Sequence, residues 1–234
     1  YKRSVLGIAW KMLTTLGTML VMSIVFSKAF GIHEKGYPAY ILSGLMAWTF
    51  FAQTTNAATV HLVWGGTLLN RIYIPRTVFA ISAVGTGLVN FVISLVPLVV
   101  VILLTGIPLR LSTLILPIPM LFLAMFSLGV GLLLSAIAIY FADITEMYQG
   151  ILTAWLYISP VIWTEGQIPS SPLVTFIVRL NPMYHLINLF RATIYAGRVP
   201  SLQEFAITGG IALVTLLIGW FFFSSRADEF AYRV

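Results

Sequence analysis

The chain alternates long apolar stretches with short polar connections, which is the pattern of helices that cross a bilayer. A membrane-spanning helix needs about 20 apolar residues in succession. Six stretches approach that length, at about 11–30, 39–61, 77–104, 114–140, 146–163 and 203–223. The sequence therefore predicts an all-α integral membrane protein with six transmembrane helices, in which residues 1–234 form a single domain.

The stretch from Ser159 to Pro200, between the fifth and sixth predicted spans, departs from this pattern. It holds five of the 11 prolines and the arginines at 179, 191 and 198. Beyond Asn181-Pro182, which can start a helix, positions 183, 186, 187, 190 and 194 are apolar and share one helical face. We therefore predict a re-entrant or interfacial helical hairpin here, with arginines placed where lipid headgroups or an anionic substrate would pass.

Several predicted spans carry stripes of polar or small residues at steps of three or four, which place them on one helical face. The second span has Thr49, Gln53 and Asn56. The third has Ser82, Thr86, Asn90 and Ser94, the fourth has Ser127, Gly131 and Ser135, and the fifth has Glu146, Gln149, Thr153, Tyr157 and Pro160. Such stripes are used either for helix–helix packing or to line a polar conduit away from lipid, and both explanations stay open.

The composition agrees with a membrane protein and excludes several kinds of chemical site. Only 9% of the 234 residues are charged, against about 25% in soluble domains. The net charge of +6 is scattered between apolar runs, so it indicates helix ends at a membrane surface and no nucleic-acid partner. The absence of cysteine excludes disulfides and thiolate chemistry. No metalloprotease, serine-hydrolase or phosphate-loop motif occurs, so we expect no catalytic residue, metal or cofactor in this chain.

The sequence leaves the orientation in the membrane open. Six spans put both termini on one side, but the basic residues divide seven to six between the two sides, so the positive-inside rule decides little. The chain starts at Tyr1 without an initiator methionine, from which we expect further residues before this start in the natural protein.

Five short segments follow one another in a specific order. They are YKRSVLGIAW at the start, NRIYIPR at 70–76, FADI at 141–144, SPVIW at 159–163 and NPMYHLINLFR at 181–191. In this order they resemble the permease subunits of ABC transporters that export polysaccharides, O-antigen and teichoic acid. One departure is Ala142, where that family has an arginine before the aspartate. The resemblance spans nearly the whole chain.

The resemblance implies a homodimer bearing two cytoplasmic ABC ATPase subunits, which would bind the ATP and Mg²⁺, with both termini of this chain in the cytoplasm. The connection at 62–76 would then couple to the ATPase, within it the segment Leu68–Arg76. The expected coupling residues are Asn70, Arg71, Ile72, Tyr73, Ile74, Pro75 and Arg76. Polar side chains at the rim and apolar ones between them suit a docking segment. An ordinary basic loop at the headgroups is the alternative.

The resemblance also implies a translocation path along the dimer axis and an outer gate. The gate would comprise residues 164–200 together with the residues just before them. The expected path residues are Trp48, Gln53, Asn56, Gln149, Thr153, Tyr157 and Trp163. The expected gate residues are Ser159, Pro160, Asn181, Pro182, Tyr184 and Arg191.

The function expected from the resemblance is export of a lipid-linked polysaccharide across the cytoplasmic (inner) membrane, driven by a partner ATPase. The aromatic residues, 14% of the chain, would serve either as an interfacial belt or as a stacking surface for sugars. Within the class, the alternative cargo is a drug, haem or another lipid. Outside the class, the alternative is a membrane scaffold or enzyme, which the absence of paired catalytic groups disfavours.

Overall fold

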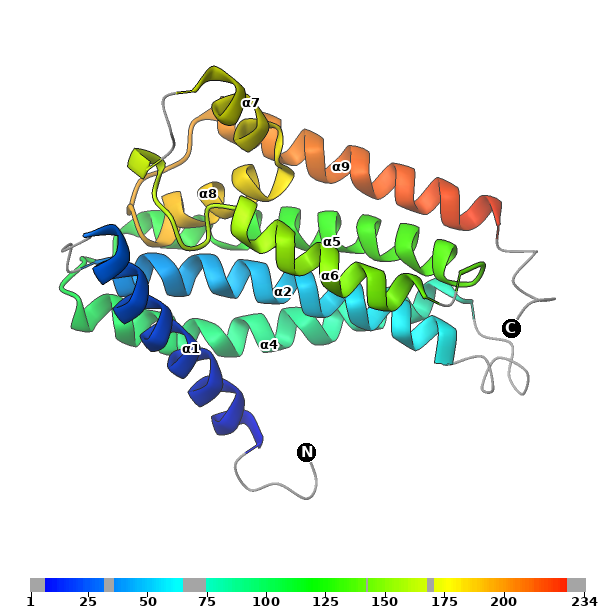
Figure 1. The fold of residues 1–234 in the computed structure, drawn as a ribbon, viewed down its shortest axis with the longest axis horizontal. Helices are drawn as coiled ribbons and strands as arrows, with labels where there is room; N and C mark the ends of the chain where they lie inside the picture. Colours follow the sequence, from blue (N-terminus) through cyan, green and yellow to red (C-terminus); the bar gives the residue numbers. More distant parts are fainter. Residues whose placement is uncertain (1–6, 32–35, 65–74, 142, 168–170, 227–234) are drawn as a thin grey trace.

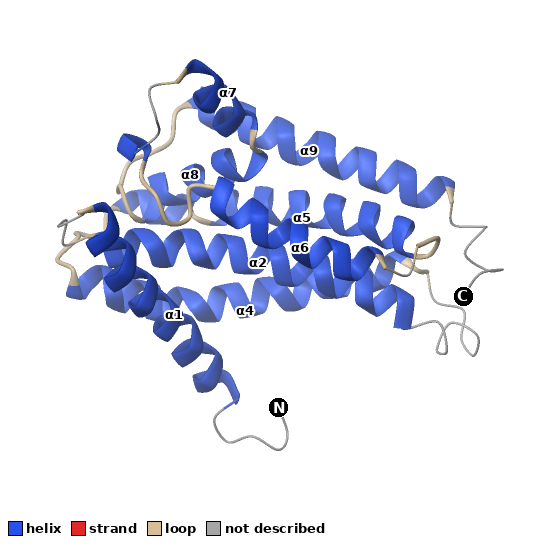
Figure 2. Cartoon of the chain, in the orientation of Figure 1, coloured by secondary structure: helices blue, strands red, loops and turns tan. Residues whose placement is uncertain are grey.

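The computed structural model describes residues 7–31, 36–64, 75–141, 143–167 and 171–226. Every regular element in these ranges is a helix (Figure 2), as predicted. In chain order the elements are α1 (Gly7–Phe30), α2 (Tyr37–Trp64), α4 (Thr77–Leu104), η1 (Leu111–Ile115), α5 (Pro117–Ala138), α6 (Ile144–Ile158), η2 (Glu165–Gln167), α7 (Pro172–Leu180), α8 (Pro182–Ile194) and α9 (Leu202–Ser225).

Helix α2 lies at the centre of the bundle and packs against α1, α4, α5, α6 and α8. Figure 1 shows α2, α4 and α5 running side by side along the long axis, with α9 beyond α5 and α1 crossing at an angle. The ring of Phe51 on α2 lies 5.2 Å from that of Trp155 on α6 and 5.4 Å from that of Phe126 on α5. Aromatic pairs at these distances bury large apolar areas in favourable tilted arrangements, so this cluster fixes α6 onto the bundle.

Helices α5 and α9 approach each other closely, and glycines make this approach possible. A Cβ at Gly129 on α5 would lie 2.5 Å from the carbonyl oxygen of Thr215 on α9, and a Cβ at Gly219 would clash with the backbone of Gly129. Small residues allow membrane helices to approach in this way. In the predicted small-residue stripe of α5, Ser127, Gly131 and Ser135 are buried, so for this stripe the packing explanation is correct.

Among the described residues, three helical stretches could cross a membrane by length and composition, namely Thr77–Leu104, Leu111–Ala138 and Leu202–Ser225. The pair α7 and α8, bent by 76°, could supply a fourth. The predicted fifth span is shorter than expected, because α6 has 15 residues and ends at Ile158. At about 1.5 Å per residue it is about 22 Å long, against about 30 Å for the hydrocarbon core.

The segment between the fifth and sixth predicted spans contains the two short helices that the sequence predicts. Helix α8 starts at Asn181-Pro182 as expected, and the apolar positions 183, 186, 187, 190 and 194 are all buried. Figure 1 shows α7 and α8 at the same end of the bundle as the start of α9. We call this region, formed by α7, α8, the chain at 159–167 and the start of α9, the hairpin end.

Candidate functional site

Arg191 on α8 connects three parts of the chain at the hairpin end. Its guanidinium donates hydrogen bonds to the carbonyl oxygens of Pro160, Val161 and Tyr40, the last two at 2.9 Å. It also lies over the Tyr40 ring, 3.5 Å from the ring centre. The residue is only 4% exposed. Because a buried charge is tolerated only when it is fully bonded, these contacts hold α8, α2 and the chain after α6 together.

A glycine on α2 makes room for this guanidinium. A Cβ at Gly44 would clash with Nη2 of Arg191 and lie 3.1 Å from the carbonyl oxygen of Val161. Ser43, one residue earlier, accepts a hydrogen bond from Nε of Arg191 at 3.4 Å. The expectation that Arg191 offers its charge to headgroups or substrate needs correction, since carbonyl groups surround that charge inside the fold.

Asn181 forms a second buried connection at the corner between α7 and α8. Its Oδ1 accepts hydrogen bonds from the backbone N–H of Met183 at 3.0 Å and from Nε1 of Trp155 at 2.9 Å. Its Nδ2 donates to Oγ of Ser159 at 3.0 Å. The side chain thus caps α8 and ties it to the end of α6. Pro182 occupies the first turn of α8, where its missing N–H costs least.

Replacing Asn181 with alanine is expected to lower the free energy of unfolding by about 2–3 kcal/mol, because α8 loses its cap and the buried Nε1 of Trp155 loses its acceptor. Ser159→Ala removes only one partner of Asn181, so its cost is expected to stay near 1 kcal/mol. Thermal unfolding of the purified permease in detergent measures both. Equal effects of the two variants would contradict this account.

A cleft of about 820 Å³ opens at the hairpin end between α8 and the first turns of α9. Its polar lining includes Arg179, Tyr184, His185, Asn188, Arg191, Arg198, Gln203 and Glu204. Glu204 belongs to a capping box, in which it accepts from the N–H of Ser201 at 2.7 Å while its own N–H donates to Oγ of Ser201. The predicted gate residue Tyr184 lies in this cleft, half-buried.

The structure separates the predicted path residues into exposed, half-buried and buried ones. Gln149, Thr153 and Tyr157 form an exposed stripe along α6, and Gln53 on α2 is also exposed. Trp48 is a correction, because it is only 6% exposed and packs edge-on to Trp155 with the ring centres 6.0 Å apart. Asn56 and Trp163 are half-buried. Nε1 of Trp163 donates to the carbonyl oxygen of Tyr157 at 3.0 Å.

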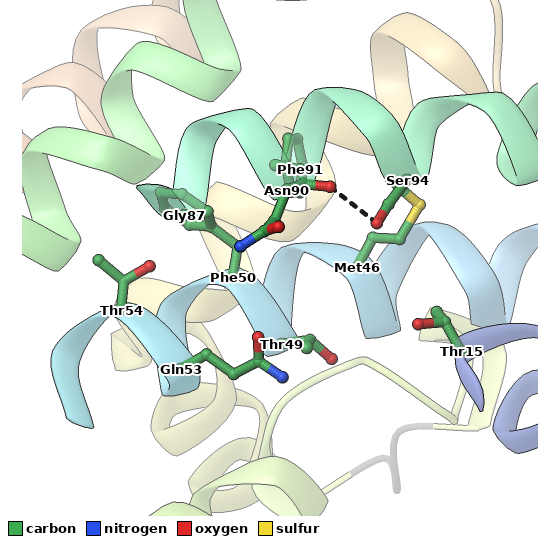
Figure 3. A pocket seen from close by; sticks show the side chains of 10 residues that line it. All are labelled: Thr15, Met46, Thr49, Phe50, Gln53, Thr54, Gly87, Asn90, Phe91 and Ser94. Atoms are coloured by element: carbon green, nitrogen blue, oxygen red, sulfur yellow. Dashed lines mark hydrogen bonds between the residues drawn. The ribbon is translucent and has the colours of Figure 1, made fainter. Parts of the chain in front are cut away.

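The polar stripes of α2 and α4 meet at a small cavity, which the sequence did not predict. The cavity measures about 50 Å³, enough for at least one water. Figure 3 shows its lining, with Thr49, Gln53 and Thr54 from α2, Asn90 and Ser94 from α4, and Thr15 from α1. Oγ1 of Thr54 is buried and has no hydrogen-bond partner among the described residues. In the N-terminal part of the α4 stripe, by contrast, Ser82 and Thr86 are exposed.

Of the predicted coupling segment, Asn70, Arg71, Ile72, Tyr73 and Ile74 lie outside the described residues. Pro75 is exposed and Arg76 is half-buried at the start of α4. Burial lowers the pKa of the Arg76 guanidinium, but arginine stays charged at neutral pH.

Sequence reasoning missed the face of α2 that receives the hairpin end. Besides Tyr40 and Gly44, this face presents Tyr37, whose hydroxyl donates to the carbonyl oxygen of Ile162 at 2.9 Å. The hydroxyl of Tyr40 donates to the carbonyl oxygen of Trp163 at 3.1 Å. The available signal was the spacing of Tyr37, Tyr40 and Gly44, which puts two tyrosines and a glycine on one helical face.

Three curated relatives match the chain along almost its full length. One, from Myxococcus xanthus, is 27% identical over 234 residues, covering all of this chain and 90% of the relative. Two from Klebsiella pneumoniae are 21% and 20% identical, each covering 99% of this chain and 88% of the relative. All three are named O-antigen export system permease protein RfbA.

A family profile assigns the chain to a known family. The profile described as ABC-2 type transporter matches residues 1–195, which is most of the chain. The match includes α1 to α8 and so contains both buried connections of the hairpin end. This chain belongs to the ABC-2 type transporter family, a family of membrane transport proteins.

Proposed function

We propose that this chain is the membrane-spanning subunit of an ATP-driven exporter that moves a lipid-linked polysaccharide, O-antigen or teichoic-acid-like, across the cytoplasmic membrane. The observation that carries the proposal is the similarity over almost the full length to three O-antigen export permeases. Hydrolysis of ATP with Mg²⁺ is assigned to two separate ABC ATPase subunits on the cytoplasmic side.

In this proposal the chain crosses the membrane six times, with both termini in the cytoplasm and the hairpin end at the outer surface. The 76° corner at Asn181 supports a re-entrant geometry, in which α7 and α8 enter and leave the outer leaflet. The Asn181 side chain accepts a hydrogen bond from the backbone N–H of Met183 at this corner, and backbone groups inside a membrane require such partners. The short α6 would reach the outer surface through the residues that follow it, of which Ser159 has an extended backbone.

The exposed stripe of α6 supports a homodimer with a polar path between the protomers. Tyr157 is 58% exposed. Gln149 and Thr153 precede it in steps of four residues, on the same face of α6. An exposed amide is costly against lipid, so this face is better covered by a second copy or by a polar substrate. Gln53 adds an amide on the neighbouring α2. These four residues are the proposed path lining.

The coupling segment is tested by replacing Tyr73 and Arg76 with alanine. We expect the double variant to lose the partner ATPase on co-purification and to lose export, because the segment gives up the aromatic side chain proposed to anchor it in the ATPase and one charged rim contact. Arg110→Ala is a suitable control, since Arg110 is exposed and precedes η1, far along the chain from this segment. Normal assembly and export in the double variant would refute the coupling role.

The substrate is tested with the permease–ATPase complex reconstituted in vesicles. Addition of a lipid-linked polysaccharide is expected to accelerate ATP hydrolysis, and the same polysaccharide without its lipid is not. Acceleration by a hydrophobic drug or haem, with no response to the glycan, would favour the alternative cargo. ATP hydrolysis that is independent of this subunit would favour a scaffold.

A further inference from the structure

The cleft at the hairpin end carries an excess of positive charge. Its one carboxylate among the described lining residues, Glu204, is held by Arg198 in a two-point ion pair, with N–O distances of 2.6 and 2.8 Å. Arg191 is buried and its guanidinium is bonded to carbonyl oxygens, so it adds formal positive charge to the wall of the cleft but does not itself contact a ligand. The described side chains of the cleft therefore favour an anionic ligand.

Arg179 on α7 is the arginine of this cleft that remains available. It is exposed, and its guanidinium has no hydrogen bond or ion pair with the described residues. Its backbone carbonyl is hydrogen-bonded to Nε2 of His185 at 2.8 Å, which fixes the end of α7 against α8. Among the described residues, one of the three arginines in this segment is thus buried, one is ion-paired, and one lines the cleft without a partner.

The elements that supply the cleft lining also expose apolar side chains outside it. On α7, Leu173, Phe176 and Leu180 are exposed, Phe176 by 66%. Arg179 lies one helical turn after Phe176, at the edge of this apolar face. Val199 and Leu202 are exposed just before and at the start of α9. A positive cleft on elements that also expose apolar side chains suits a ligand that has both an anionic head and an apolar tail.

We propose that this cleft binds the phosphate-bearing headgroup of a lipid, with Arg179 contacting the phosphate and the lipid tail lying along the exposed apolar face of α7. The guanidinium fork fits a phosphate group in two-point contacts. Tyr184, Asn188 and Gln203 also line the cleft. Their polar side chains suit hydrogen bonds to the hydroxyl or sugar groups that such headgroups carry. The volume of about 820 Å³ lies within the range of about 300–1,000 Å³ for small-molecule sites.

This chemistry fits two sources, a phospholipid of the bilayer or the phosphate that links a glycan to its lipid. The inference rests on the membrane topology in the proposed function, but it does not require that the cargo be a polysaccharide. Lipid binding can be measured without ATP or transport, so failure of this inference and failure of the export function are distinguishable.

The test measures lipid binding to the delipidated permease complex by native mass spectrometry. Phosphatidylglycerol, a polyprenyl phosphate and the phosphate-free diacylglycerol are titrated separately. The variants are Arg179→Gln, Arg179→Lys, and Arg110→Gln as the matched control, because Arg110 is also exposed but does not line the cleft. Equal unfolding temperatures of the variants establish that each is folded, as expected for exposed side chains.

We expect Arg179→Gln to weaken phosphate-lipid binding about tenfold, the effect of one lost charge-assisted hydrogen bond. Arg179→Lys is expected to retain part of the affinity, and Arg110→Gln all of it. Tighter binding of phosphatidylglycerol assigns the site to a bilayer lipid, whereas tighter binding of the polyprenyl phosphate assigns it to the lipid carrier. The proposal is overturned if diacylglycerol binds as well as the phosphate lipids, or if Arg179→Gln behaves like Arg110→Gln.

Discussion

Replacing Arg191 with methionine is expected to lower the free energy of unfolding by about 2–5 kcal/mol and to detach the hairpin end from α2. The carbonyl oxygens of Pro160 and Val161 lie outside the helices and would lose the guanidinium that bonds to them. A buried acceptor left without a partner costs about 1–3 kcal/mol, and methionine fills the space of the side chain without replacing any donor. Thermal unfolding of the purified permease measures the loss.

Two further variants test whether the effect of Arg191→Met comes from the loss of its buried guanidinium. Arg191→Lys keeps the charge but not the planar fork, so it is expected to recover only part of the stability. Arg110→Met removes an exposed arginine near the same end of the molecule, where it lies beside Gly197, and is expected to change stability by less than about 0.5 kcal/mol. If Arg191→Met unfolds at the same temperature as Arg110→Met, the connecting role of Arg191 is wrong.

Gly219→Ala is expected to destabilise the permease by about 2–3 kcal/mol, although alanine is the better helix former. The added methyl group would meet the backbone of Gly129 on α5, and a backbone cannot move aside as a flexible side chain can. The two helices must separate along their closest contact, and overpacking of this kind typically costs about 1–3 kcal/mol. The unfolding temperature and the yield of monodisperse protein in detergent report the effect.

Helix α9 provides its own control for this prediction. Gly210 lies on the same helix, is exposed, and a Cβ there would have no heavy atom within 4 Å. Gly210→Ala should therefore show only the gain in helix propensity, about 1 kcal/mol or less. Opposite signs for Gly219→Ala and Gly210→Ala would establish that the crossing of α5 and α9 matters. Equal shifts would show that helix propensity alone explains both.

The contrast between Arg179, Arg191 and Arg198 shows where sequence reasoning reaches its limit. All three lie in a short segment rich in proline, and the sequence assigns them the same expected role. In the structure, Arg191 bonds to carbonyl groups from residues about 30 and 150 positions away along the chain, as the pairs with Val161 and Tyr40 show. Arg198 pairs with Glu204, six positions later. The partners of Arg191 are so far away in the chain that they leave no periodic signal.

What the sequence alone determined is what depends on local patterns. Apolar runs require helices because backbone groups must be bonded inside the helix when water is absent, and this predicted the helical class and much of the element order. Asn181-Pro182 with the apolar positions after it predicted α8 and its buried face, because capping and the 3.6-residue period act within a few residues. The ordered motifs indicated the transporter family to which the profile also assigns the chain.

Only the tertiary structure decided which polar residues are structural and which remain exposed. Trp48 and Arg191 are buried because α6 and α8 pack over α2, whereas Gln149, Thr153 and Tyr157 on α6 stay uncovered. The cleft beside Arg179 exists because α7, α8 and the start of α9 converge at one end. The physical reason is that burial and charge pairing depend on distances in space, which helices far apart along the chain determine together.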